Sequence, residues 1–107
     1  MLAVFDAYID HARAAYVHGF RGCGLLNAAA ELPAGAPGRV AVREHKEQVE
    51  AILAAGLAGI VDADRAAELG EQLAFVFEGA VARAGLEGSV GRLVHARAIA
   101  ASLVDGP

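Results

Sequence analysis

The stretch at residues 62–84 constrains the fold most, because it predicts a long helix with two apolar sides. Asp62 is expected to cap the N-terminus of this helix, and Asp64 places a negative charge near its positive end. The apolar residues follow the helical period, with Phe75, Gly79 and Ala82 on one side and, on the other, Ala66, Leu69, Gly70, Leu73, Ala74, Val76, Phe77, Ala80, Val81 and Ala84. A helix with this pattern must be covered from two directions.

The same periodicity predicts further helices and no strand, so the expected fold is an all-α domain of about five helices. They are expected at residues 2–17, in a short segment that ends near Glu31, at residues 37–57, and after Ser89, which serves as a cap. Pro37 fits the first position of its helix, because that position needs no backbone N–H donor. The last helix is again two-sided, with Val90, Val94 and Ala101 on one side and Ile99 and Leu103 on the other.

Length and composition indicate one domain that associates with a copy of itself. The chain has 107 residues, which is close to the commonest domain size. Apolar residues make up 56% of the sequence, and a single core of this size is unable to absorb all of them, although 26 are alanines. The net charge of −4 offers no basic surface to the phosphates of DNA. We therefore expect an oligomer that does not bind DNA by itself.

Three features indicate a cytoplasmic protein without a membrane partner. The single cysteine, Cys23, is unable to form an intrachain disulfide, which fits a reducing compartment. The longest apolar run, at residues 51–61, has 11 residues and is too short to span a bilayer. Asp6 and Asp10 interrupt the N-terminal apolar segment, so it does not read as a signal peptide.

Residues 20–33 read FRGCGLLNAAAELP. This stretch resembles a motif in the ligand-sensing half of TetR-type (tetracycline-repressor-like) transcriptional regulators. That family joins a helix-turn-helix DNA-binding domain to a helical domain that dimerises and receives a small-molecule effector. Residues 43–46, 78–80 and 96–97 follow in the order and at about the spacing of the family's later helices, so the resemblance covers about residues 2–105. The chain has no counterpart of the DNA-binding domain.

The resemblance implies that residues 1–107 form the effector-sensing and dimerisation domain of a bacterial repressor. A small apolar or aromatic effector would bind among the first four helices, shift the first helix, and change the spacing of the DNA-reading domains across a homodimer. DNA would be contacted only through a DNA-binding domain that is not present in this chain. The alternative is a passive helical dimerisation module without a ligand. A sealed, alanine-packed bundle would favour that alternative, and an apolar pocket reached by Tyr8, Asn27 and His45 would disfavour it.

The last two helices are the expected dimer contact, where they would form a four-helix bundle across the homodimer. The residues expected in that interface are Leu69, Gly70, Leu73, Phe77, Val81, Val94, Arg97 and Ala101. Arg97 falls in the middle of an apolar face, which suits a subunit interface, since arginine is enriched there. The alternative for Arg97 is an intrachain pair with Glu71 or Glu78.

A ligand site is expected where aromatic residues of the first helix face the interior and a few polar groups meet them. Its predicted walls are Phe5, Tyr8, Ile9, Asn27, His45, Val49 and Phe75. His45 lies within an apolar helix face, as a ligand contact or as a core histidine bonded to the backbone. Asn27 is either a group that orients the ligand or an amide that ties two helices together.

Catalytic chemistry has little support in the sequence. The segment Glu44-His45-Lys46-Glu47 lacks a second histidine at zinc-protease spacing, so neither a metal site nor a cofactor is expected. Ser89 is not in a nucleophile elbow, and no nucleophile, base and orienting group come together in the sequence. A small helical enzyme is therefore the third hypothesis, behind the sensing domain and the passive module.

Overall fold

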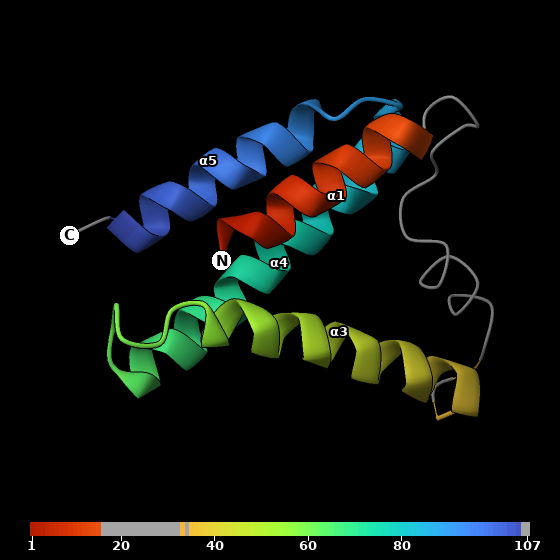
Figure 1. The fold of residues 1–107 in the computed structure, drawn as a ribbon. Coiled ribbons are helices and arrows are strands. Elements are labelled where there is room, and N and C mark those ends of the chain that lie inside the picture. The colour runs from red at the N-terminus through yellow and green to blue at the C-terminus, as the bar shows by residue number, and fades with distance from the viewer. Residues whose placement is uncertain (16–32, 34, 106–107) are drawn as a thin grey trace.

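The computed structural model describes residues 1–15, 33 and 35–105, and within these ranges the chain forms four helices and no strand (Figure 1). The helices are α1 at Leu2–Ala15, α3 at Pro37–Ala55, α4 at Ala63–Glu87 and α5 at Gly91–Asp105. This confirms the all-α prediction. The short helix expected before residue 32 lies outside the described residues.

The predicted helix signals are found at the observed helix ends. The side chain of Asp62 accepts a hydrogen bond of 2.8 Å from the backbone N–H of Arg65, so Asp62 is the N-cap of α4. Pro37 stands at the start of α3, as predicted. Gly88 ends α4 with a left-handed φ of 68°, and its N–H bonds back to the carbonyl of Ala84. Ser89 Oγ accepts a 3.2 Å hydrogen bond from the N–H of Gly91, the first residue of α5.

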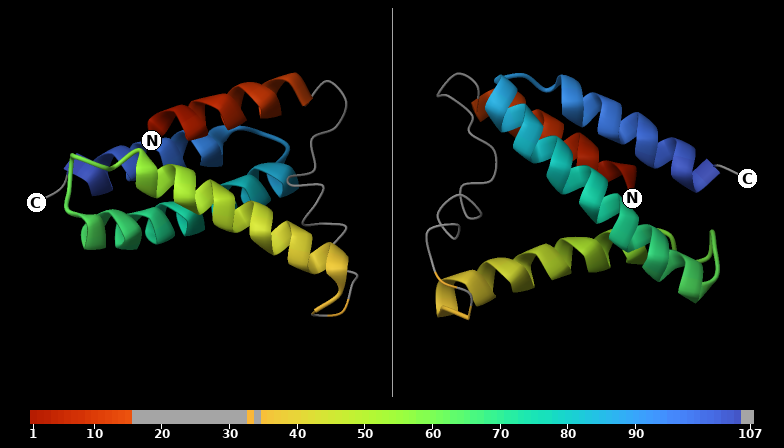
Figure 2. Two further views of the ribbon diagram at one scale, coloured as in Figure 1. Left: turned by 60° about the horizontal axis from the view of Figure 1, so that its bottom comes forward. Right: turned by 180° about the vertical axis from the view of Figure 1, so that it is seen from behind.

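α4 is the central helix of the fold. Its broad apolar side is buried against the other helices, whereas Phe75 on the opposite side is 65% exposed. The largest fully buried side chains come from all parts of the described core: Phe5, Leu53, Leu57, Leu69, Leu73 and Leu93. α1 lies across one side of α4 and beside α5. When the molecule is seen from behind, α4 and α5 lie nearer the viewer and α1 lies beneath them (Figure 2, right).

α3 and α4 meet closely at one corner and diverge from it (Figure 1). Gly70 of α4 allows the close approach, since a Cβ at that position would lie 2.8 Å from the Cβ of Ala54 in α3. Residues 56–62 form the turn between the two helices. The other end of α3 therefore stands away from the rest of the fold. None of the four helices in the described ranges combines the length and the apolarity that crossing a membrane requires.

Candidate functional site

α1 presents two neighbouring faces, one packed into the core and one open to a groove. The core face carries Phe5, Ile9 and Ala12, whose exposure is 6% or less. The groove face carries Val4, Ala7, Tyr8 and His11. Because these four positions recur at intervals of three and four residues, they lie together on one side of the helix.

α3 forms the facing wall of the groove with His45, Lys46 and Val49. These residues share one side of the helix by the same spacing. Val49 is half-buried and His45 is exposed. The Lys46 side chain keeps only 20% of its surface exposed, so its methylenes add to the apolar wall while its ammonium group stays at the edge.

Phe77 of α4 forms the floor and fixes the position of Tyr8. The Phe77 ring meets the ring of Tyr8 edge to face, with centroids 5.3 Å apart, and it meets Phe5 at the same distance and angle. Tyr8 also contacts the His11 ring at 5.5 Å. Edge-to-face pairs of this kind contribute about 0.5–1.5 kcal/mol beyond the area they bury. The aromatic wall is therefore held by the core rather than left to rotate.

An ion pair joins the two sides of the groove at Lys46 and Glu78. Lys46 Nζ lies 4.0 Å from Glu78 Oε1, and the Glu78 side chain is 31% exposed. This separation is too long for a strong direct hydrogen bond, so the attraction is mainly Coulombic. The pair places one positive and one negative group at the polar edge of an otherwise apolar groove.

The groove has a volume of about 430 Å³. Small-molecule sites usually have about 300–1,000 Å³, mostly apolar walls and a few polar groups. A second hollow of about 380 Å³ lies at the corner of α3 and α4. Alanine, glycine and valine alone line it, so it has no side chain that could orient a ligand. The groove is therefore the better candidate for a binding site.

The structure brings together three of the residues predicted for the ligand site, namely Tyr8, His45 and Val49. Phe5 and Ile9 do not line the groove, because they lie on the adjacent core face of α1. Phe75 lies on the far side of α4 and is 65% exposed, so it is also outside the groove. Asn27 belongs to the part of the chain that is not described.

Sequence reasoning missed His11, Lys46 and Glu78 as groove residues. His11 follows Tyr8 by three positions, and Lys46 precedes Val49 by three, so helical spacing alone could have placed both beside predicted site residues. Glu78 had no comparable signal, because its position depends on how α3 crosses α4. These three residues supply most of the polar chemistry of the groove.

Most residues predicted for the dimer interface lie in the core of the single chain. Leu69, Leu73, Phe77 and Val81 are exposed by 6% or less, and Gly70 is buried against Ala54. A side chain already covered by its own chain has little surface left for a partner. Of the others, Val94 is 43% exposed, and Arg97 and Ala101 are half-buried.

Arg97 is paired within the chain, but with an acid that the sequence did not suggest. Its Nε lies 2.6 Å from Oδ1 of Asp6 in α1, and its Nη2 lies 3.4 Å from Oδ2. Glu78, one of the two expected partners, pairs with Lys46 instead. The Arg97–Asp6 pair is partly exposed and ties α5 to the side of α1 away from the groove.

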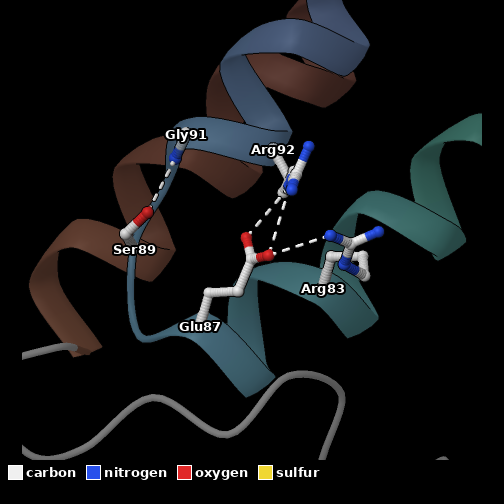
Figure 3. A network of polar contacts seen from close by, with 5 residues as sticks. All are labelled: Arg83, Glu87, Ser89, Gly91 and Arg92. Carbon is white, nitrogen blue, oxygen red and sulfur yellow. Dashed lines mark hydrogen bonds and ion pairs between the residues drawn. The ribbon is translucent and has the colours of Figure 1, made fainter.

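A second polar cluster joins the end of α4 to the start of α5 (Figure 3). Glu87 accepts hydrogen bonds of 3.0 Å from both Arg92 Nε and Arg83 Nη2. The hydrogen bond from Arg92, and to a smaller extent the one from Arg83, holds the pKa of Glu87 below its ordinary value. The three side chains are at the surface and away from the groove, so we assign them to the α4–α5 connection.

Within the described ranges, no three His, Cys, Asp or Glu side chains lie close enough to hold a metal ion. No protein-family model matches the sequence, and no significant match is found among curated proteins or solved structures. What the groove offers chemically is an apolar volume with imidazole, ammonium, phenol and carboxylate groups at its edge.

Proposed function

We propose that this chain is the effector-sensing domain of a TetR-like transcriptional repressor, and that the groove between α1, α3 and α4 binds a small apolar or aromatic molecule. The observation that carries the proposal is the build of the groove, with an aromatic floor, apolar walls and few polar side chains. The motif at residues 20–33 supports the TetR-like assignment by resemblance. The function of a passive dimerisation module does not require such a groove. We therefore keep the passive module as the second candidate.

The proposed mechanism is allosteric. α1 forms one wall of the groove and also packs on α4 and α5, so a ligand between α1 and α3 acts on a helix that belongs to the core. The ligand changes the arrangement only as far as its affinity differs between the two spacings of these helices. In a protein that carries DNA-reading domains, a shift of α1 would alter their separation.

A thermal-shift screen with apolar and aromatic metabolites tests the groove. A ligand at a hundredfold excess over its Kd stabilises the folded state by about 2.7 kcal/mol, which raises the Tm of a domain of this size by several degrees. Ala7→Trp fills the groove from α1 and should abolish the shift. Ala98→Trp makes the same change on α5, outside the groove, and should retain it.

Hits that survive Ala7→Trp would place the ligand elsewhere. A complete absence of hits from a broad screen would favour the passive module. His45→Ala should reduce the thermal shift as well, because His45 lines the groove. An unchanged shift would show that this histidine does not contact the ligand.

The proposal includes a homodimer, formed through the uncovered side of α4 and α5. On α4, Phe75, Gly79, Ala82 and Leu86 recur at helical intervals and make one exposed apolar stripe, with Leu86 85% exposed. Phe77 faces α1, and Phe75 lies about 200° around the helix from Phe77, so the stripe points away from α1. The small residues Gly79 and Ala82 would allow a partner helix to approach closely.

α5 adds Ile99 to the same side of the molecule. Arg97 faces Asp6 of α1, and Ile99 lies about 200° around α5 from Arg97. Ile99 is 49% exposed. The view from behind shows α4 and α5 side by side with no other described helix over them (Figure 2, right). An exposed apolar surface on two adjacent helices suits a four-helix contact with a second copy.

Sedimentation of matched variants tests the dimer. Phe75→Arg should give a monomer at micromolar concentration, because it places a charge within the proposed contact. Ile52→Arg changes a residue of similar exposure, 58% against 65%, on α3 and should leave the dimer intact. A wild-type chain that sediments as a monomer, or equal effects of the two variants, would contradict the proposed interface.

A further inference from the structure

The exposed apolar stripe of α4 has a self-complementary order of side-chain sizes. Phe75 and Leu86 are its large ends, and Gly79 and Ala82 lie between them. The intervals are four, three and four residues, so the stripe has the same order of sizes from either end. Its midpoint falls between Gly79 and Ala82, and each large side chain lies about 8 Å from that midpoint along the helix. Such a surface is able to pack against an inverted copy of itself.

A two-fold axis through this midpoint would place opposite ends of two stripes together. In a two-fold contact, residue i meets residue j of the partner, and residue j meets residue i. Phe75 of each copy would then meet the partner's Leu86. A Cβ at Gly79 would meet no atom of the described residues within 4 Å, so a second helix has room to approach closely at the crossing point.

The end of the stripe at Phe75 is bordered by negative charge. Glu71 and Glu68 precede Phe75 by four and seven residues, so they continue the same side of α4. Arg65 pairs with Glu68 at 3.1 Å. Two carboxylates against one guanidinium group make this end acidic.

The end of the stripe at Leu86 is bordered by positive charge. The cluster of Arg83, Glu87 and Arg92 has two guanidinium groups against one carboxylate (Figure 3). An antiparallel pair of α4 helices brings this basic end to the acidic end of the partner's stripe. A parallel pair would bring like ends together, which charge repulsion disfavours. Charge therefore favours the same arrangement as the order of sizes.

α5 matches the stripe less well than a second α4 does. Its exposed side carries Ile99, and the exposed neighbours of Ile99 at helical spacing are Arg92, His95 and Ser102. An apolar stripe laid against this side would bury polar groups and meet only one large apolar side chain. Burial of polar groups without partners is unfavourable.

We infer that the α4 helices of two copies pair antiparallel, with Phe75 of each copy packed on the partner's Leu86 and the two-fold axis between Gly79 and Ala82. This inference rests on the homodimer proposed above, and it names the contact and its register. α5 then lies beside the α4 pair in each copy.

The test is charge complementation between two variants, measured by sedimentation with one variant fluorescently labelled. Phe75→Lys and Leu86→Glu should each weaken their own dimer at least about thirtyfold, because each places an unpaired charge in both contacts. In the mixed dimer, one contact stays native and the other joins the introduced lysine to the introduced glutamate. The matched control mixes Phe75→Lys with Leu86→Lys, which brings two lysines together. We expect the mixture of opposite charges to dimerise about tenfold more tightly than the control mixture.

Other arrangements predict no dependence on the sign of the charge. In a parallel α4 pair, position 75 of one copy and position 86 of the other are about 17 Å apart along the helix, and in a contact with α5 neither meets the other. Equal affinities of the two mixtures, with a dimeric wild type, would overturn the register and leave the homodimer. A monomeric wild type would overturn both. Phe75 and Leu86 are 65% and 85% exposed, so circular dichroism should show that all three variants keep the fold.

Discussion

Phe77→Ala and Phe75→Ala make the same chemical change two residues apart on α4, and the structure predicts different outcomes. Phe77 is 6% exposed and contacts the rings of Phe5 and Tyr8, whereas Phe75 is 65% exposed. Truncation of a buried phenylalanine costs about 3–5 kcal/mol, and the two ring contacts place Phe77 in the middle of that range, at about 4 kcal/mol. Phe75 buries only a minor part of its side chain, so its truncation should cost the monomer less than about 1 kcal/mol.

A loss of about 4 kcal/mol is a large share of the 5–15 kcal/mol that stabilises a typical domain. For this chain it corresponds to a decrease in Tm of roughly 15 °C. The assay is urea unfolding followed by circular dichroism at about 1 µM and about 50 µM protein. The loss in Phe77→Ala should be the same at both concentrations, because the contacts lie within one chain. Any loss in Phe75→Ala should be larger at the higher concentration, where a larger share of the chain is dimeric.

Equal losses in the two variants at low concentration would refute the assignment of the core face of α4. A loss below about 1 kcal/mol for Phe77→Ala would refute it as well.

Four further predictions concern other parts of the fold. Gly70→Ala should lower the free energy of unfolding by about 1–3 kcal/mol, because its Cβ would lie 2.8 Å from that of Ala54. Gly79→Ala has open space around it and should raise the free energy of unfolding of the monomer by about 0.5–1 kcal/mol. Thermal unfolding measures both changes. Asp62→Ala should cost about 0.5–2 kcal/mol through the lost cap of α4, and Asp62→Asn should recover most of it. Arg97→Ala should cost less than about 1 kcal/mol, since its pair with Asp6 is partly exposed, and a double-mutant cycle with Asp6→Ala isolates the pair; a coupling near zero would show that it contributes nothing. Arg92 and Arg83 lower the pKa of Glu87 in the folded state, so ionised Glu87 stabilises the fold above its unfolded-state pKa, and this stabilisation is lost as the pH falls through its folded-state pKa. Acid unfolding should therefore be less steep in Glu87→Gln and unchanged in the surface variant Glu44→Gln.

The sequence predicted the helices well where their signals are local. The cap at Asp62 and the proline at position 37 act within one helical turn, and both are found at the expected helix ends. The two apolar sides of α4 were also evident from spacing. We expected the broad side of α4 in the dimer contact, whereas the structure buries it in the chain's own core. The choice between the two sides depends on how α1, α3 and α5 pack together, which local spacing does not encode. Area favours the observed answer, since the broad side with Leu69, Leu73 and Phe77 buries far more apolar surface than the narrow one.

The groove was predicted in part for a related reason. Helical spacing placed Phe5, Tyr8 and Ile9 on one apolar side of α1, but that side is divided between two neighbours, the core and the groove. A division of this kind depends on the crossing of α3, which no local pattern encodes. The Arg97–Asp6 pair is another example, because its two residues are 91 positions apart in the chain.

The corner at Gly70 and Ala54 gives α3 the geometry of a lever. α3 has 19 residues, and at 1.5 Å per residue its first residue stands about 26 Å from Ala54, while His45 stands about 14 Å away. A rotation of about 5° around the corner would therefore move His45 by about 1 Å and the start of α3 by about 2 Å. A ligand that widens the groove by a fraction of a bond length at Val49 would therefore cause the largest displacement at Pro37, the end of the helix farthest from the corner.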